Sequence, residues 1–174
     1  SSSYSFGMSL DSVVSTIVST SKSLAKNVEL QVYESGAIRD GRYANNAFLQ
    51  ELPDGVSKVT WDNYLALSPK FAESLGFKQF DVVSVKASNG YAIDLPVLIQ
   101  PGQANGTASV ALGYGRTKTG KAGDNVGQNA YPFIQFVNGT MQYANSVELS
   151  GTGRTYELAQ TQTHHSFEGR NIIR

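Results

Sequence analysis

Residues 81–100, DVVSVKASNGYAIDLPVLIQ, decide the fold class of this chain. The first half alternates between apolar and polar side chains as a half-buried strand does, and the second half is a largely apolar run. The two halves meet at Asn89-Gly90, a pair that favours a tight hairpin turn because both residues tolerate a positive φ. Pro101-Gly102 turns the chain again, and 107–115, TASVALGYG, predicts another strand.

A short helix is predicted directly before this sheet, in 68–77, SPKFAESLGF. Ser68 is a good N-cap, Pro69 suits the first helical position, and Gly76 suits the left-handed residue that follows a helix. The helix would have one or two turns. Its inward-facing side chains are expected to be Phe71, Ala72 and Leu75.

The remaining segments predict two more strands and a longer helix. Residues 28–34, VELQVYE, alternate like a strand, and 57–68, SKVTWDNYLALS, predict an extended segment. After Ser9, apolar residues recur at three- and four-residue steps, which predicts a helix that either packs on the domain or belongs to a preceding one. These positions are Leu10, Val13, Val14, Ile17, Val18 and Leu24. Closely spaced strands with one short helix indicate a barrel or a sandwich rather than a doubly wound sheet.

Composition excludes several kinds of function. With 174 residues the chain suits one domain, and its 14 basic residues balance 14 acidic ones, so no nucleic-acid partner is expected. Because the chain has no cysteine, it cannot itself form a disulfide or bind an Fe–S cluster through thiolates. No apolar run approaches the ~20 residues of a membrane span, so no direct membrane insertion is expected.

The segment 113–133, GYGRTKTGKAGDNVGQNAYPF, contains the spacing of a phosphate-binding P-loop at Gly115, Gly120 and Lys121. A P-loop leads into a helix whose N-terminal amides hold the phosphates, and a Ser or Thr follows its lysine. Here Ala122 takes that place, and the Gly-, Asn- and Pro-containing residues after it oppose a helix. The sequence therefore argues against a nucleoside triphosphatase.

Two interpretations of this glycine-rich segment remain open. Its backbone could bring amides, together with the cations Arg116, Lys118 and Lys121, close to an anionic or highly polar ligand. Alternatively, it is a long solvated connection. No nucleophile elbow and no recognisable acid/base pair is found in the sequence, so no independent catalysis is expected from this domain.

The order of these elements resembles the C-terminal dinucleotide-binding domain of molybdopterin oxidoreductases. That family combines a strand, a loop near the cofactor, a PxxAxxLG helix, a strand, a hairpin with a glycine, an LPV strand, a PG turn and a strand that ends in glycine. The resemblance covers about 28–133 and implies a mainly β fold, the double-psi β-barrel, with an N-terminal helix and one short helix. The matching residues are Pro69, Ala72, Leu75, Gly76, Val83, Val85, Gly90, Pro96, Val97, Pro101, Gly102 and Gly113.

Three segments, 44–72, 113–133 and 160–174, resemble more narrowly the large iron–sulfur subunit of the bacterial alternative complex III, a quinol-oxidising respiratory assembly. This resemblance implies an N-terminal helical segment (1–27), a barrel domain (28–158) and a tail (159–174). The tail would lead to a ferredoxin-like domain of the same parent chain, with the Fe–S clusters. It also implies contacts with other subunits of a membrane-associated complex, on the extracytoplasmic, periplasmic side of the inner membrane.

The resemblance further implies roles for particular residues. In molybdopterin enzymes this domain grips molybdopterin guanine dinucleotide, whereas the metal ligand comes from another domain, so no metal ligand is expected here. Asn45 and Asn46 match the loop after the first strand, and Asn129 matches the asparagine after the glycine-rich loop. An amide offers both donor and acceptor to the edge of a flat heterocycle. The cations expected at the pyrophosphate are Arg116, Lys118 and Lys121.

Two functions follow from this family. In the alternative complex III subunit the molybdopterin-like part is regarded as having lost its cofactor, which implies a scaffold that supports electron transfer from quinol, with no cofactor in this domain alone. The alternative is an active molybdopterin-guanine-dinucleotide-binding domain of a molybdenum oxidoreductase. The adjacent His164 and His165 would point to opposite faces of a strand and so do not readily chelate one metal. With Glu168 and Arg170, they are expected to contact the cluster-bearing domain or to orient a cofactor at a domain junction.

Overall fold

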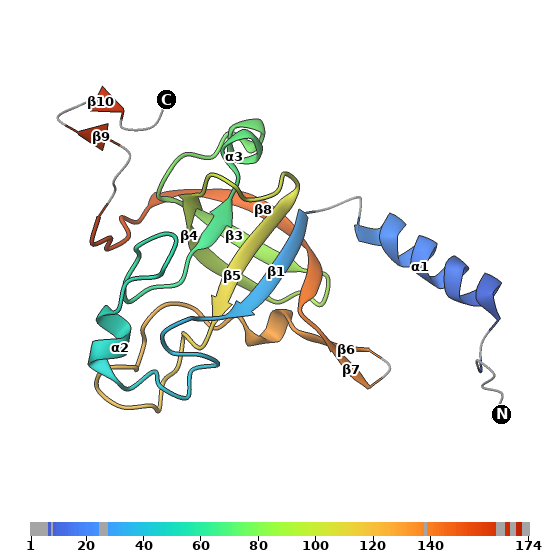
Figure 1. Ribbon diagram of the computed structural model, residues 1–174, viewed down its shortest axis with the longest axis horizontal. Helices are drawn as coiled ribbons and strands as arrows, with labels where there is room; N and C mark the ends of the chain where they lie inside the picture. Colours follow the sequence, from blue (N-terminus) through green and yellow to red (C-terminus); the bar gives the residue numbers. More distant parts are fainter. Residues whose placement is uncertain are drawn as a thin grey trace, which may run out of the picture.

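The computed structural model describes residues 7, 9–24, 28–137, 139–162, 166–167 and 170–171. Its centre is a closed barrel in the strand order β1-β5-β2-β4-β3-β8 (Figure 1). The barrel strands are β1 (Val28–Glu34), β2 (Leu65–Leu67), β3 (Asp81–Ala87), β4 (Ala92–Ile99), β5 (Thr107–Leu112) and β8 (Ala144–Thr155). The sequence predicted a barrel or a sandwich, and the chain forms the barrel. The predicted mainly β fold is confirmed.

Two parallel strand pairs determine the topology of the barrel. β1 runs parallel to β5 and β2 runs parallel to β4, while β2 and β5 pair antiparallel. The connections from β1 to β2 and from β4 to β5 therefore each skip one strand. The predicted hairpin joins β3 to β4, and at its turn Gly90 has a φ of +87°. The Gly90 amide donates to the Ala87 carbonyl at 3.0 Å.

The hydrophobic core lies inside the barrel, and a smaller cluster lies outside it. Leu65 and Leu67 of β2 point into the barrel, whereas Ala66 between them joins the outer cluster. Phe133 closes the barrel core with no exposed surface, and its ring meets Tyr91 edge to face at 5.3 Å between centroids. The outer cluster consists of Val59, Tyr64, Ala66, Leu98 and Leu158.

The short helix predicted before the sheet is α3 (Pro69–Leu75), and its capping is confirmed. The Ser68 hydroxyl accepts a hydrogen bond from the Phe71 amide at 3.2 Å, and Gly76 is left-handed with a φ of +74°. Ala72 is fully buried, as predicted, and Phe71 is half-buried against the barrel core. The prediction that Leu75 faces inward is wrong. Its side chain is 38% exposed, because it lies at the end of the helix, one turn beyond Phe71.

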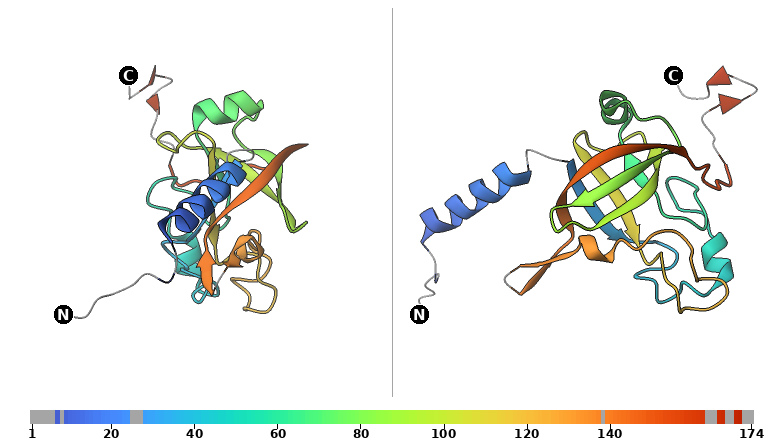
Figure 2. Two further views of the ribbon diagram at one scale, coloured as in Figure 1. Left: turned by 90° about the vertical axis from the view of Figure 1, so that its right-hand side faces the viewer. Right: turned by 180° about the vertical axis from the view of Figure 1, so that it is seen from behind.

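A second short helix, α2 (Ala47–Glu51), lies between β1 and β2, where the sequence predicted no helix. At the start of the chain, the helix predicted there is α1 (Leu10–Leu24). It stands away from the barrel in Figure 1 and in the right-hand view of Figure 2. Its apolar side chains remain accessible, with Leu10 78% and Ile17 61% exposed. Of the two alternatives that the sequence left open, the structure does not show this helix packed on the barrel with its apolar face.

The C-terminal part adds short elements to the barrel. A 3-10 turn, η1 (Tyr131–Phe133), leads into a hairpin of β6 (Gln135–Val137) and β7 (Thr140–Gln142), and the tail contains β9 (Ser166–Phe167) and β10 (Arg170–Asn171). The predicted contact residues His164, His165 and Glu168, and the side chain of Arg170, lie outside the described part of the structure. None of the helices in the described ranges has the length and apolarity of a membrane span.

Candidate functional site

Two loops meet at one end of the barrel because β1 and β5 are parallel and therefore end side by side (Figure 1). Residues 35–46 follow β1, and residues 113–130, which we call the glycine-rich loop, follow β5. The Arg116 Nη2 donates to the Asp40 carbonyl at 2.8 Å, and the Tyr131 hydroxyl donates to the same carbonyl at 2.6 Å. These contacts join the loop that follows β1 to the loop that follows β5.

The glycine-rich loop folds back on itself instead of entering a helix. Arg116 forms an isolated β-bridge with Asp124. The Gly115 amide donates to the Val126 carbonyl, and the Asn125 amide donates to the Arg116 carbonyl, both at 2.7 Å. The argument against a P-loop is therefore confirmed. The loop is also more than a solvated connection, since its backbone groups bind one another.

Glycines in this loop allow the chain to approach itself closely. At Gly115, where φ is +70°, an added Cβ would lie 2.2 Å from the Asn129 amide nitrogen. At Gly120, an added Cβ would lie 2.4 Å from the side-chain amide of Asn45. A Cβ at Gly115 would require the backbone to shift, and one at Gly120 would require the Asn45 side chain to move. The glycine content that suggested a ligand is therefore explained, at these positions, by packing within the protein.

The Asp124 carboxylate accepts hydrogen bonds from the backbone amides that most resemble a phosphate-binding nest. Its Oδ1 accepts from the Thr119 amide at 2.6 Å and from the Gly120 amide at 3.1 Å. The amide of Ala122 donates to Asn45 Oδ1 at 3.2 Å. Successive amides that point at one anion form an anion-binding concavity. In this loop the anion is the protein's own carboxylate.

We expect Asp124→Ala to open the loop locally. The amides of Thr119 and Gly120 would lose a charged acceptor, so the free energy of unfolding should fall by about 1–3 kcal/mol and both amides should exchange hydrogen faster. Denaturant titration and hydrogen exchange followed by NMR would measure this. Lys118→Ala in the same loop is the control, with an expected change within about 0.5 kcal/mol. Unchanged exchange at both amides in Asp124→Ala would contradict this role for the carboxylate.

The loop surrounds a cleft with a volume of about 430 Å³, which we call the loop cleft. Arg116, Lys118 and Asn129 line it, so the structure brings three of the six predicted site residues together. The other lining residues are Tyr114, Gly115, Thr117, Thr119 and Tyr131. Arg116 is held by its bonds to the carbonyls of Gly113 and Asp40. The Asn129 Oδ1 accepts from the Tyr131 amide at 3.0 Å and so holds a turn.

The other three predicted residues lie away from the loop cleft. Asn45 supports the glycine-rich loop through its contact with Ala122. Asn46 caps α2, because its Oδ1 accepts from the Phe48 amide at 3.1 Å and the Leu49 amide at 3.4 Å. Lys121 is exposed and is not among the residues that line the cleft. Pterin recognition by the asparagines and pyrophosphate binding by the cations stay predictions.

Asp40 adds a negative charge beside the loop cleft. Hydrogen bonds from the Arg42 side chain and backbone lower the pKa of Asp40 to about 2, with smaller contributions from the charges of Arg42 and Arg116. Burial raises the pKa of Tyr131, and the charge of Asp40 raises it further. At neutral pH the two cations of the cleft therefore lie near the carboxylates of Asp40 and Asp124, and Tyr131 is neutral. Within the described residues, no group of three or more His, Cys, Asp or Glu side chains could hold a metal ion.

Asn63 is a structural residue of this site that the sequence analysis did not identify. It is 2% exposed, and its Nδ2 donates at 2.9 Å to the carbonyls of both Ala111 and Gln128. Its Oδ1 accepts from the Gln128 amide, also at 2.9 Å. One buried amide thus fastens the end of the glycine-rich loop to β5. In the sequence, the feature that could have identified Asn63 is a single amide side chain directly before the apolar residues of β2, because a buried amide needs hydrogen-bond partners.

Comparison with known proteins supports the fold. No family model and no curated protein matches the sequence. Among solved structures, acetylene hydratase from Pelobacter acetylenicus is similar, with a TM-score of 0.53 and 17% sequence identity. The match covers 78% of this chain and 19% of that one. At this identity the similarity shows the fold alone, a barrel domain that spans about a fifth of the larger enzyme's length.

Proposed function

We propose that this chain is a molybdopterin-dinucleotide-binding-like domain that serves as a scaffold without a cofactor of its own. The barrel that this chain shares with acetylene hydratase, together with the sequence resemblance of 28–133, supports a molybdopterin-oxidoreductase-like domain at this coarse level. The observation that carries the scaffold proposal is the position of Asp124. Its carboxylate already binds the amides of Thr119 and Gly120, so a pyrophosphate held on this loop would meet a negative charge and occupied donors.

The parent of this domain is proposed to be the iron–sulfur subunit of a respiratory complex that oxidises quinol, like alternative complex III. This finer assignment rests on the sequence resemblance of 44–72, 113–133 and 160–174. The proposed partners are a ferredoxin-like domain of the same parent and the other subunits of the complex, on the periplasmic side of the membrane. The exposed apolar faces of α1 and the β6–β7 hairpin, where Phe136 is 71% exposed, are suited to contacts with such neighbours.

The loop cleft favours a second candidate, an active domain that binds molybdopterin guanine dinucleotide. Arg116 and Lys118 bring two positive charges to this cleft of about 430 Å³, and its lining includes Asn129. Such cations could form charge-assisted hydrogen bonds with a pyrophosphate outside the amides that Asp124 occupies. The two candidates differ in whether the parent protein contains pterin and metal.

Analysis of the purified full-length parent protein separates these candidates. We expect iron and the visible absorption of Fe–S clusters, but no stoichiometric molybdenum, tungsten or pterin. Metal content would be measured by mass spectrometry, and pterin by the fluorescence of its oxidised form. Molybdenum or tungsten together with pterin, at about one dinucleotide site per chain, would overturn the scaffold proposal in favour of the active domain. Absence of iron would overturn the iron–sulfur assignment.

A further inference from the structure

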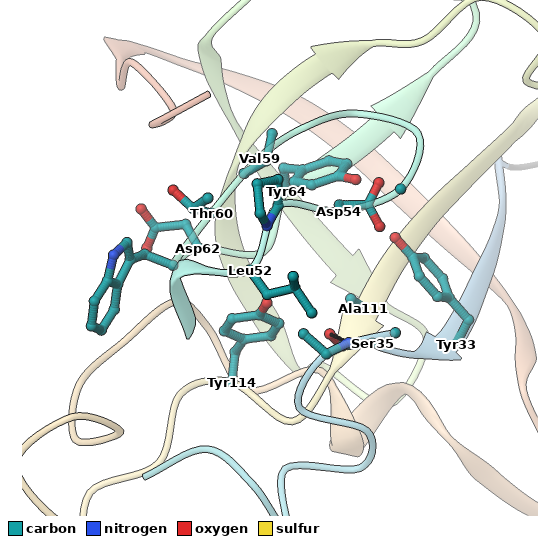
Figure 3. Close-up of a pocket in the computed structure, with 15 residues that line it drawn as sticks. Tyr33, Ser35, Leu52, Asp54, Val59, Thr60, Asp62, Tyr64, Ala111 and Tyr114 are labelled. Carbon is teal, nitrogen blue, oxygen red and sulfur yellow. Dashed lines mark hydrogen bonds between the residues drawn. The ribbon is translucent and has the colours of Figure 1, made fainter. Parts of the chain in front are cut away.

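A second cavity lies on the outer face of the barrel, where β1 and β5 end. The inward side chains of these strands, Val32 and Val110, belong to the core, so the alternating Tyr33 and Ala111 point outward. These two residues are paired in the β1–β5 register. The segment 52–64 covers them and leaves a cavity with a volume of about 180 Å³, which we call the tyrosine cavity (Figure 3).

The lining of this cavity combines aromatic rings with carboxylates. Tyr33, Tyr64 and Tyr114 surround it, and Figure 3 shows Asp54 beside the hydroxyls of Tyr33 and Tyr64. Asp62 lies on the opposite side. Tyr114 also lines the loop cleft, so the two spaces share one wall but are otherwise built from different residues.

Asp54 is fixed as a carboxylate by its neighbours. Its Oδ1 accepts from the Val56 amide at 3.0 Å and from the Ser57 amide and hydroxyl at 2.8 and 2.9 Å. Burial acts to raise the pKa of Asp54, but these hydrogen bonds and the charge of Lys58 outweigh it, and the pKa is lowered. The Tyr64 hydroxyl donates to the Ser57 hydroxyl at 2.7 Å and extends this network into the cavity. None of these donors uses the second carboxylate oxygen of Asp54.

The tyrosines stay neutral at physiological pH. Burial is the main cause that raises the pKa of Tyr33, Tyr64 and Tyr114 above the ordinary tyrosine value. Their ring faces attract cations through the aromatic quadrupole, and each hydroxyl keeps its hydrogen, which Tyr64 donates to Ser57.

The charge around the tyrosine cavity is negative. Two carboxylates and no Lys, Arg or His are among its lining residues. The neighbouring cation is Lys58, whose ammonium donates to the Gly55 carbonyl at 2.7 Å and so offsets one charge in part. An anion would be repelled here, and a purely apolar molecule would leave the charge of Asp54 without a counter-charge in the cavity. The volume is slightly larger than the cavity of about 150 Å³ that holds benzene in an engineered protein.

We propose that the tyrosine cavity binds a small organic ammonium ion. The tyrosine rings supply the aromatic faces, the carboxylate of Asp54 supplies the opposite charge, and the volume admits a head group of trimethylammonium size; the Asp62 carboxylate accepts from the Tyr156 hydroxyl at 2.8 Å and adds negative charge only from the rim. This site goes beyond the scaffold function. It belongs to this chain alone and depends neither on a pterin nor on the proposed parent complex.

A charged ligand and its neutral isostere test the proposal directly. The 174-residue chain would be titrated by calorimetry with choline and with 3,3-dimethylbutan-1-ol, which has the same shape but carbon in place of the charged nitrogen. We expect choline to bind and the alcohol to bind at least about 10-fold more weakly. Equal affinities would overturn the proposal, as would the absence of choline binding at millimolar concentration.

Two variants locate the binding to this cavity. Ala111→Leu would fill the space with three extra carbons and should abolish choline binding, whereas Ala92→Leu, an exposed position on β4 outside the cavity, should leave it unchanged. Asp54→Asn keeps the shape and the Oδ1 acceptor and should weaken binding about 10-fold. Wild-type affinity in either Ala111→Leu or Asp54→Asn would overturn the site. Thermal unfolding of each variant would show whether it is folded, and Asp54→Asn alone decides if Ala111→Leu is not.

Discussion

Replacing Phe133 by alanine is expected to lower the free energy of unfolding by about 3–5 kcal/mol. The ring has no exposed surface and lies within the barrel core, so its removal leaves a cavity among side chains that come from different strands. It also removes the edge-to-face contact with Tyr91 at 5.3 Å, and such pairs contribute beyond the area that they bury. Denaturant titration followed by circular dichroism would measure the change.

Phe136→Ala is the matched control, because the same ring is removed three residues further along the chain. Phe136 is 71% exposed, so the loss of its ring should change the free energy of unfolding by no more than about 0.5 kcal/mol. Equal losses in the two variants would show that Phe133 does not close the barrel core.

Local signals predicted most of the fold. The Asn89-Gly90 turn and the capping pair of Ser68 and Gly76 act within a few residues, and both are where the sequence placed them. α2 was missed because it has only five residues, too few for an apolar period. The resemblance assigned its cap, Asn46, to the loop near the cofactor, and the capping role was not predicted. A periodic pattern also cannot show what covers it, which is why the exposed face of α1 could not be predicted.

The candidate site was predictable only in part, for a physical reason. The parallel pairing of β1 and β5 brings the two loops together, and this order of elements was available from the resemblance. The sequence could not predict which backbone amides of the loop are free to bind a ligand. This depends on how the Asp124 carboxylate folds back onto the amides of Thr119 and Gly120. The tyrosine cavity likewise joins residues from 33 to 114, and all of its strand side chains are on the outward face of the barrel. No local pattern marks such a combination.

Gly115→Ala is expected to lower the free energy of unfolding by more than about 3 kcal/mol in total, which exceeds the loss from an ordinary glycine substitution. Two costs add at this position. Its φ of +70° is left-handed, which costs roughly 1–2 kcal/mol for a residue with a Cβ. In addition, the new Cβ would lie 2.2 Å from the Asn129 nitrogen and 2.6 Å from the Gln128 carbonyl carbon. Both contacts are with backbone, which cannot rotate away, so the loop must shift.

Gly76→Ala separates the two costs. Gly76 has nearly the same φ, +74°, but an added Cβ there meets nothing within 4 Å, so only the left-handed cost of about 1–2 kcal/mol remains. The difference between the two variants in denaturant titration measures the closeness of the chain at Gly115. NMR shifts at 128–129 should change in Gly115→Ala and not in Gly76→Ala. Similar losses of stability in both variants would mean that the backbone at 128–129 shifts at little cost in free energy. The glycine at position 115 would then be explained by its positive φ alone.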